Sequence, residues 1–204
     1  VLVMGAAEPL GSACTQILAL DGFDYLTLVD RDRARLDYLA RRVLYDYGVA
    51  CKISTQVSRA VARADLIVVA GERAKPGLDS SEIKPGTVVC NLSAVPRLTL
   101  DILHRRPDVM IFDQAVLRLP GETVLDYDLG LPEREIYAPM AEAILMALEG
   151  RFDRYFLGPE MRVEKILDMR NLSRKHGFIL SGFAALSHHF DFAGVRAIKN
   201  NRPA

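Results

Sequence analysis

The chain has 204 residues, enough for one good hydrophobic core, or for one domain with a C-terminal attachment. Half of the residues are hydrophobic and a quarter are charged, and the net charge is zero, so bulk electrostatics give no support for nucleic-acid binding. No apolar run approaches the roughly 20 residues of a membrane-spanning helix, and no signal peptide is recognisable, so we expect a cytoplasmic protein.

The first part of the chain alternates short apolar runs with helical stretches. Val1–Gly5 predicts a strand, Pro9–Leu20 a helix, and Tyr25–Asp30 a second strand. Arg33–Tyr47 carries apolar residues at helical spacing, with Gly48 as the expected C-cap. The chain starts inside the first strand-like run and without methionine, so we expect a further N-terminal domain upstream of it.

Later apolar runs predict further strands of the same sheet. Leu66–Ala70 is continuously apolar, which is typical of a strand buried on both faces of a parallel sheet. Strands alternating with helices indicate an α/β fold, a doubly wound and mostly parallel Rossmann sheet, because each right-handed crossover lays its helix on one face. The remaining predicted elements are strands at Cys51–Ile53, Thr87–Leu92 and Val109–Phe112, and helices at Ser58–Ala64 and Leu98–Arg106.

The pattern loosens after Asp113, and two extra helices are predicted beyond it. Glu135–Glu149 and Met161–His176 carry apolar residues at helical spacing, and a glycine follows each. We therefore expect residues 1–130 to form the Rossmann core, residues 131–190 a C-terminal helical segment packed on it, and residues 191–204 a polar tail. The apolar C-terminal helices could also pack on a second copy of the chain, which leaves a homo-oligomer open.

The junction between the first strand and the first helix has the outline of a nucleotide-binding turn. A strand that runs into a helix N-terminus leaves backbone N–H groups unpaired at the positive end of the helix dipole, where phosphate fits. Gly5 would allow the tight exit from the strand, Ala6 and Ala7 a close backbone approach, and Gly11 close packing of helix on sheet. We assign pyrophosphate binding to Gly5, Ala6, Ala7, Glu8, Pro9, Leu10 and Gly11.

Two residues of this turn depart from the common glycine-rich pattern. The spacing is Gly-x5-Gly, and an ordinary strand–turn–helix with a glycine at each bend is the alternative. Glu8 places a negative group near a negative ligand, and Pro9 removes one donor N–H. The turn remains usable if Glu8 points to solvent and Pro9 occupies the first helical turn, where proline is tolerated.

Asp30 ends the second strand, at a position where an acidic side chain can accept hydrogen bonds from the adenosine ribose. Its charge would repel a 2′-phosphate, which favours NAD. Arg31 and Arg33 follow, however, and an arginine beside this site can hold a 2′-phosphate instead, so NADP stays an alternative. A solvated charge run at a helix start is the remaining interpretation.

The loops after the fourth and fifth predicted strands should lie along the same edge of the sheet, where open α/β sheets bind ligands. We expect Ala70, Gly71 and Ser93 to contact the nicotinamide side of the cofactor, with flexible surface loops as the alternative. Lys75 follows the fourth strand and could meet substrate, although a solvated lysine is the favoured interpretation.

Several stretches resemble the C-terminal half of aldehyde-forming long-chain acyl–acyl carrier protein reductases and their shikimate-dehydrogenase-like relatives, the predicted amino acid dehydrogenases. They are "GAAEPLGSA", "ARLDYLARRV", "ADLIVVA", "PEREIYAPMAEAILMALEGR" and "VEKILDMRNLSRKHGF", and the resemblance extends from Val1 to Phe178. It implies a Rossmann domain that binds a nicotinamide cofactor, and a separate N-terminal region that helps to form an acyl site.

The resemblance also implies reduction of an acyl thioester through a cysteine that accepts the acyl group, chemistry that needs a thiolate. The family's cysteine falls on Pro139 here, and proline cannot be acylated. Cys90 is the only substitute that we name, and a buried strand cysteine is its favoured interpretation. Asp30 is a second departure, since reductases of this family that prefer NADPH tend to lack an acid just before their arginine.

The residues and the resemblance together predict the NAD(P)-binding domain of an oxidoreductase for a carbonyl, amino-acid or acyl substrate. A fatty acyl thioester reductase that forms an aldehyde and a non-catalytic dinucleotide-binding module are the alternatives. The catalytic residues stay unknown. No metal site is expected, since His188 and His189 are adjacent and the three cysteines lack metal-ligand spacing.

Overall fold

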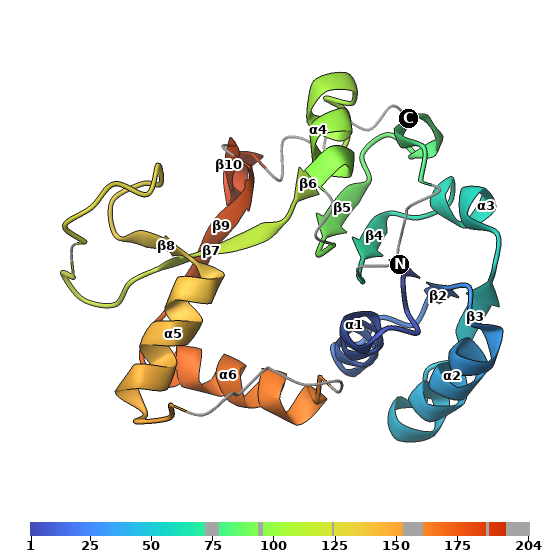
Figure 1. Cartoon of the computed structure of the whole chain (residues 1–204), viewed down its shortest axis with the longest axis horizontal. Helices are drawn as coiled ribbons and strands as arrows, with labels where there is room; N and C mark the ends of the chain where they lie inside the picture. The colour runs from blue at the N-terminus through green and yellow to red at the C-terminus, as the bar shows by residue number, and fades with distance from the viewer. Residues whose placement is uncertain (72–77, 94–95, 124, 153–160, 187, 195–204) are drawn as a thin grey trace. The chain divides into compact units, whose positions relative to one another are not determined.

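The computed structural model describes residues 1–71, 78–93, 96–123, 125–152, 161–186 and 188–194 (Figure 1). The described residues form two compact units, Val1–Ile111 and the part of the chain from Phe112 onward. The predicted boundary at residue 130 lies later than this division. The reason is that, among the described residues, the strand Gln114–Arg118 pairs with two later strands of the second unit.

The first unit contains a six-stranded parallel sheet, as predicted. Its strand order is β3-β2-β1-β4-β5-β6, so the order reverses between the neighbours β1 and β4, as in a dinucleotide-binding fold. The strands are β1 (Leu2–Met4), β2 (Leu26–Val29), β3 (Cys51–Ser54), β4 (Leu66–Val69), β5 (Val88–Asn91) and β6 (Met110–Phe112).

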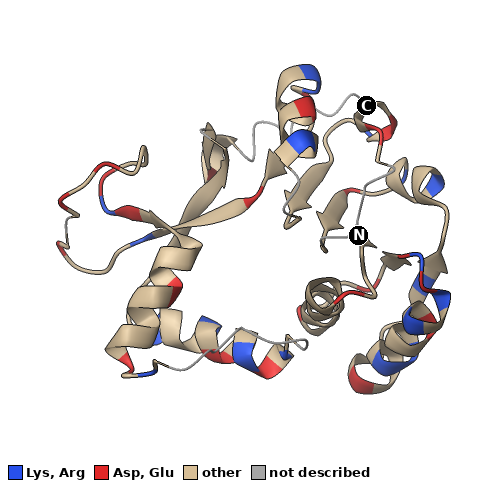
Figure 2. Ribbon diagram, in the orientation of Figure 1, with Lys and Arg blue, Asp and Glu red and all other residues tan. Residues whose placement is uncertain are grey.

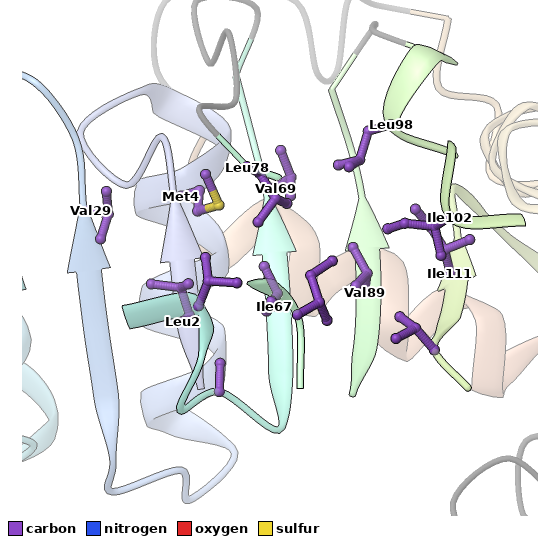
Figure 3. Close-up of a cluster of buried hydrophobic side chains, with 14 residues drawn as sticks. Leu2, Met4, Val29, Ile67, Val69, Leu78, Val89, Leu98, Ile102 and Ile111 are labelled. Atoms are coloured by element: carbon purple, nitrogen blue, oxygen red, sulfur yellow. The ribbon is translucent and has the colours of Figure 1, made fainter. Parts of the chain in front are cut away.

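Helices cover both faces of this sheet, because alternate residues of each strand point to opposite sides. On one face, Leu2 and Ile67 pack with residues of α3 and α4 in the cluster drawn in Figure 3. On the other face, Val3 and Val68 pack with residues of α1 and α2. Burying each such side chain contributes about 1.5–3 kcal/mol. The helices are α1 (Pro9–Leu20), α2 (Arg33–Tyr47), α3 (Val57–Val61) and α4 (Pro96–Arg105), with a short 3-10 helix at Ser80–Glu82.

Helices α1 and α2 have the predicted bounds. Gly48 ends α2 with φ 72°, and its N–H donates to the carbonyl of Leu44 at 3.0 Å, so it is the C-cap that the sequence predicts. Asp32 caps the start of α2, where its side chain accepts a hydrogen bond from the N–H of Arg35. Charged residues of both signs lie along this helix (Figure 2), and they pair at the exposed surface, as Arg33 does with Asp37.

The second unit contains a four-stranded antiparallel sheet that the sequence analysis did not predict. Its order is β10-β9-β7-β8, and two helices follow one another along the chain between β8 and β9. Both helices were predicted, although the first begins at Ala138 rather than at Glu135, because Glu135–Tyr137 pairs with β7. The elements are β7 (Gln114–Arg118), β8 (Glu135–Tyr137), α5 (Ala138–Leu148), α6 (Val163–Lys175), β9 (Ile179–Ala185) and β10 (His188–Asp191).

In the part of the chain that the model describes, no helix is both long and apolar enough to cross a bilayer. Most of the predicted tail, from residue 195 onward, lies outside the described residues.

Candidate functional site

The turn after β1 has the tight geometry that the sequence predicts at Gly5. Gly5 has φ 71°, and a Cβ at this position would lie 1.7 Å from the carbonyl oxygen of Ala70. The N–H groups of Gly5 and Ala6 both donate to the carbonyl of Val29, at 2.9 and 3.2 Å. Only glycine fits here, because the turn after β1 and the turn after β4 touch through their backbones.

Gly11 brings α1 close to this turn. It is buried, and a Cβ on it would lie 2.1 Å from the carbonyl oxygen of Gly5. Pro9 occupies the first turn of α1, as the sequence analysis required, so its missing N–H removes no bond within the helix. The helix start therefore sits directly against the end of the central strand.

Two backbone N–H groups at the start of α1 are available for a ligand. The first helical hydrogen bond runs from the N–H of Ser12 to the carbonyl of Glu8, at 2.8 Å. The N–H groups of Leu10 and Gly11 precede it and have no hydrogen-bond partner among the described residues. Such N–H groups at the positive end of a helix dipole favour a phosphate or another anion.

Glu8 does not point to solvent, although the prediction of a pyrophosphate site at this turn required that orientation. It is half-buried, and a Cβ on Gly71 would lie 2.4 Å from both the Cδ and the Oε2 of Glu8. The Glu8 carboxylate thus lies against the bare Cα of Gly71, which has φ 103°. The space exists because Gly71 has no side chain and because β4 lies beside β1.

Asp30 lies where the sequence predicts, directly after β2, and its carboxylate holds the neighbouring turns together. Its Oδ2 accepts a hydrogen bond from the N–H of Ala7 at 3.1 Å. Its Oδ1 accepts from the N–H groups of Arg31 and Asp32, at 2.6 and 3.2 Å. A carboxylate offers about four acceptor sites, so this arrangement leaves capacity for a ribose hydroxyl.

The other predicted contacts follow β4 and β5 at the same edge. Ala70 is buried and donates its N–H to the carbonyl of Met4 at 2.9 Å. Ser93 is tied to the end of β5, since its hydroxyl donates to Oδ1 of Asn91 at 2.6 Å. Because these strands are parallel neighbours, all the predicted site residues lie near the carboxyl edge of one sheet. Lys75 falls outside the described residues.

None of the three cysteines stands out as a nucleophile. Burial raises the pKa of the Cys14 thiol to about 11, and burial also raises the pKa of Cys51, so thiolate is scarce at neutral pH. Cys90 is half-buried within β5. Pro139 stands in the first turn of α5, so the position of the family's cysteine carries no thiol.

In the second unit the buried carboxylate of Glu135 lies beside a basic residue and a histidine, a grouping that was not predicted from the sequence. The Glu135 side chain is 4% exposed, its Oε1 lies 3.2 Å from Nη2 of Arg118, and its Oε2 lies 3.3 Å from Nε2 of His189. The imidazole of His189 lies close to Gly182. A Cβ on Gly182 would lie 3.0 Å from the Nε2 of His189. No local motif indicates this cluster, because its members come from three different strands.

Comparison with known proteins finds no family model that matches the chain. The chain is 23% identical, over 98% of its length, to an aminotransferase named PigE from Serratia sp. strain ATCC 39006, and it spans 23% of the length of that relative.

Similar solved structures include dehydrogenases and reductases that use NAD(P). A 6-phosphogluconate dehydrogenase from Plasmodium falciparum is 12% identical, with 57% of this chain and 27% of that chain covered and a TM-score of 0.45. A Δ1-pyrroline-2-carboxylate reductase from Thermococcus litoralis is 14% identical, with 41% and 26% covered and a TM-score of 0.37. A short-chain dehydrogenase from Sphingobium yanoikuyae is 29% identical, with 33% and 31% covered and a TM-score of 0.29.

Proposed function

We propose that the chain is the dinucleotide-binding part of an NAD(P)-dependent oxidoreductase that acts on a carbonyl, amino-acid or acyl substrate. The observation that carries this proposal is the start of α1, where the open N–H groups of Leu10 and Gly11 lie beside the point of strand-order reversal. Open α/β sheets bind their ligands at that point. Bound NAD(P) would supply the hydride chemistry, and the chain would bind and orient it.

The residues at the carboxyl edge suit such a ligand. The N–H groups of Leu10 and Gly11 would donate to the pyrophosphate, while Gly5 keeps the turn narrow enough for a close approach. Asp30 would accept from the adenosine ribose and, through its charge, disfavour a 2′-phosphate, so NAD is the favoured cofactor. The exposed Arg31 beside it is the feature that would favour NADP.

A second candidate is reduction of a fatty acyl thioester to an aldehyde. Two findings favour it: the resemblance to aldehyde-forming reductases, and a relative named as an aminotransferase that is about four times as long as the part it shares with this chain. Aminotransferases act on carbonyl compounds, so an aldehyde formed by one part of a longer protein would be a fitting substrate for another part. With Pro139 at the family's cysteine position, either a nucleophile elsewhere would accept the acyl group or hydride would reach the thioester directly.

Titration with NADH and NADPH tests the proposed function. We expect NADH to bind more tightly than NADPH, and because the chain has no tryptophan, fluorescence of the bound dinucleotide can be followed without energy transfer from that residue. Gly11→Val is the matched negative control, because its side chain would collide with the carbonyl of Gly5 and block the helix start. Absence of binding by either dinucleotide would overturn the proposal.

If binding is found, a longer protein that contains this chain is incubated with NADH and with each class of substrate. The products distinguish the two candidate functions. Oxidation of NADH with a carbonyl or imino acid supports the first candidate, and release of an aldehyde from an acyl thioester supports the second. Binding without turnover of any substrate would identify a non-catalytic dinucleotide module.

A further inference from the structure

The Glu8 side chain lies in the crevice where a dinucleotide would have to cross the sheet. Strands β1 and β4 are the neighbours between which the strand order reverses, and Glu8 and Gly71 belong to the turns that follow these two strands. The contact between the Glu8 carboxylate and the Cα of Gly71 therefore spans this crevice. Ligands of open α/β sheets occupy the same place.

The position of Glu8 at the helix start makes its orientation informative. Glu8 is the N-cap of α1, yet its side chain forms no capping hydrogen bond with the first turn. Instead the carboxylate lies across the crevice and places a negative charge beside the helix N-terminus, where an anion is stabilised by the helix dipole. A pyrophosphate at the N–H groups of Leu10 and Gly11 would meet this carboxylate at short range.

Two like charges at such a distance repel strongly. At about 4 Å and an effective dielectric constant of about 20, the repulsion between two unit charges is well above thermal energy. A dinucleotide can relieve it only if the Glu8 side chain turns away. Glu8 is half-buried at the surface of the unit, so this rotation requires no opening of the hydrophobic core.

We propose that Glu8 is an internal competitor for the pyrophosphate and thereby sets the affinity of the site for dinucleotides. This inference rests on the proposed function. In the absence of dinucleotide the carboxylate occupies the crevice, and binding is coupled to its displacement. The same residue that departs from the glycine-rich pattern thus weakens the site without removing it.

The experiment compares binding of NADH to the wild type, Glu8→Gln and Glu8→Ala. Glu8→Gln removes the charge and keeps the size of the side chain, so it isolates the electrostatic effect. We expect Glu8→Gln to bind NADH about tenfold more tightly than the wild type, and Glu8→Ala to bind at least as tightly as Glu8→Gln. Thermal unfolding followed by circular dichroism confirms that each variant is folded.

Asp24→Asn is the matched control for loss of one negative charge. Asp24 is exposed and precedes β2, so it lies at the amino end of the parallel sheet, away from the crevice. We expect it to leave NADH affinity unchanged. If Asp24→Asn raised the affinity for NADH as much as Glu8→Gln does, the cause would be the overall charge of the chain. That result would overturn the assignment to Glu8.

Titration with adenosine tests whether Glu8 competes with the phosphates of the dinucleotide or with another part of it. Adenosine lacks phosphate, so Glu8→Gln should leave its affinity unchanged, and an equal gain for adenosine and NADH would overturn the proposal. Equal or weaker NADH binding by Glu8→Gln would overturn the competitor role and leave the proposed function standing. If the wild type and both Glu8 variants bind neither NADH nor NADPH, the proposed function fails and the competitor role fails with it.

Discussion

Asp30 connects the turn after β1 to the end of β2, since its carboxylate accepts hydrogen bonds from the N–H groups of Ala7, Arg31 and Asp32. Asp30→Ala should therefore have two effects. Loss of the acceptor for the part-buried N–H of Ala7 should lower the free energy of unfolding by about 1–3 kcal/mol, whereas water can replace the acceptor at the exposed N–H groups of Arg31 and Asp32. Loss of the ribose acceptor and of the negative charge should also reduce the preference for NADH over NADPH.

Urea unfolding and paired titrations with NADH and NADPH measure these two effects of Asp30→Ala. Asp30→Asn is the informative companion, because it removes the charge and keeps one acceptor oxygen. A preference for NADH that is the same in the wild type and in both variants would show that Asp30 supports the turn and does not read the ribose.

Burial of the Cys14 thiol should make the free energy of unfolding depend on pH in the alkaline range. Burial raises its pKa in the folded chain to about 11, from 9.0 for an ordinary thiol, so the thiol ionises first in the unfolded chain. Below pH 9 this difference has no effect. Between pH 9 and 11 the free energy of unfolding should fall by up to about 1.4 kcal/mol for each pH unit.

Urea unfolding of the wild type and Cys14→Ala at several pH values isolates this contribution from that of other alkaline groups. The difference in stability between the two proteins should be constant below pH 9 and should change in favour of Cys14→Ala above it. Parallel curves across the whole range would contradict the burial of this thiol.

At the scale of elements, one buried carboxylate lies beside side chains of two other strands of the second sheet. Arg118 and Glu135 are paired across β7 and β8, and His189 approaches the same carboxylate from β10. Glu135→Ala should lower the free energy of unfolding of the second unit by about 1–3 kcal/mol, because the change removes the hydrogen bond from Arg118 and the carboxylate beside the imidazole of His189. The loss should not exceed this range, because the Arg118 side chain is largely exposed and can be solvated again.

Chemical denaturation followed by circular dichroism measures the effect of Glu135→Ala. Glu133→Gln is the control, since Glu133 is an exposed carboxylate two positions away. If Glu133→Gln lowered the free energy of unfolding as much as Glu135→Ala does, net charge, and not the contacts of Glu135, would govern the stability of this sheet.

At the scale of the whole molecule, the two units differ in how far the sequence predicts them. In the first unit each crossover is local, and strongly apolar strands alternate with amphipathic helices, so α1 and α2 were predicted with the bounds that the structure shows. In the second unit β7 pairs with β9, and the hydroxyl of Ser181 donates to the carbonyl of Val116 across 65 positions. Short strands with distant partners leave no clear local pattern, so only the two helices of this unit were predicted.

The sequence by itself determined the parallel sheet, the glycine turn after β1 and the acidic residue after β2, because each depends on a local pattern or on backbone conformation that few residues allow. Only the tertiary structure decided where the Glu8 carboxylate lies and which residues surround Glu135. Both depend on space left by a glycine of a neighbouring segment: Gly71 admits Glu8, and Gly182 admits His189. The direction of these side chains depends on the space that a missing glycine side chain leaves. The order of residues along the chain does not show which glycine will lie opposite which side chain.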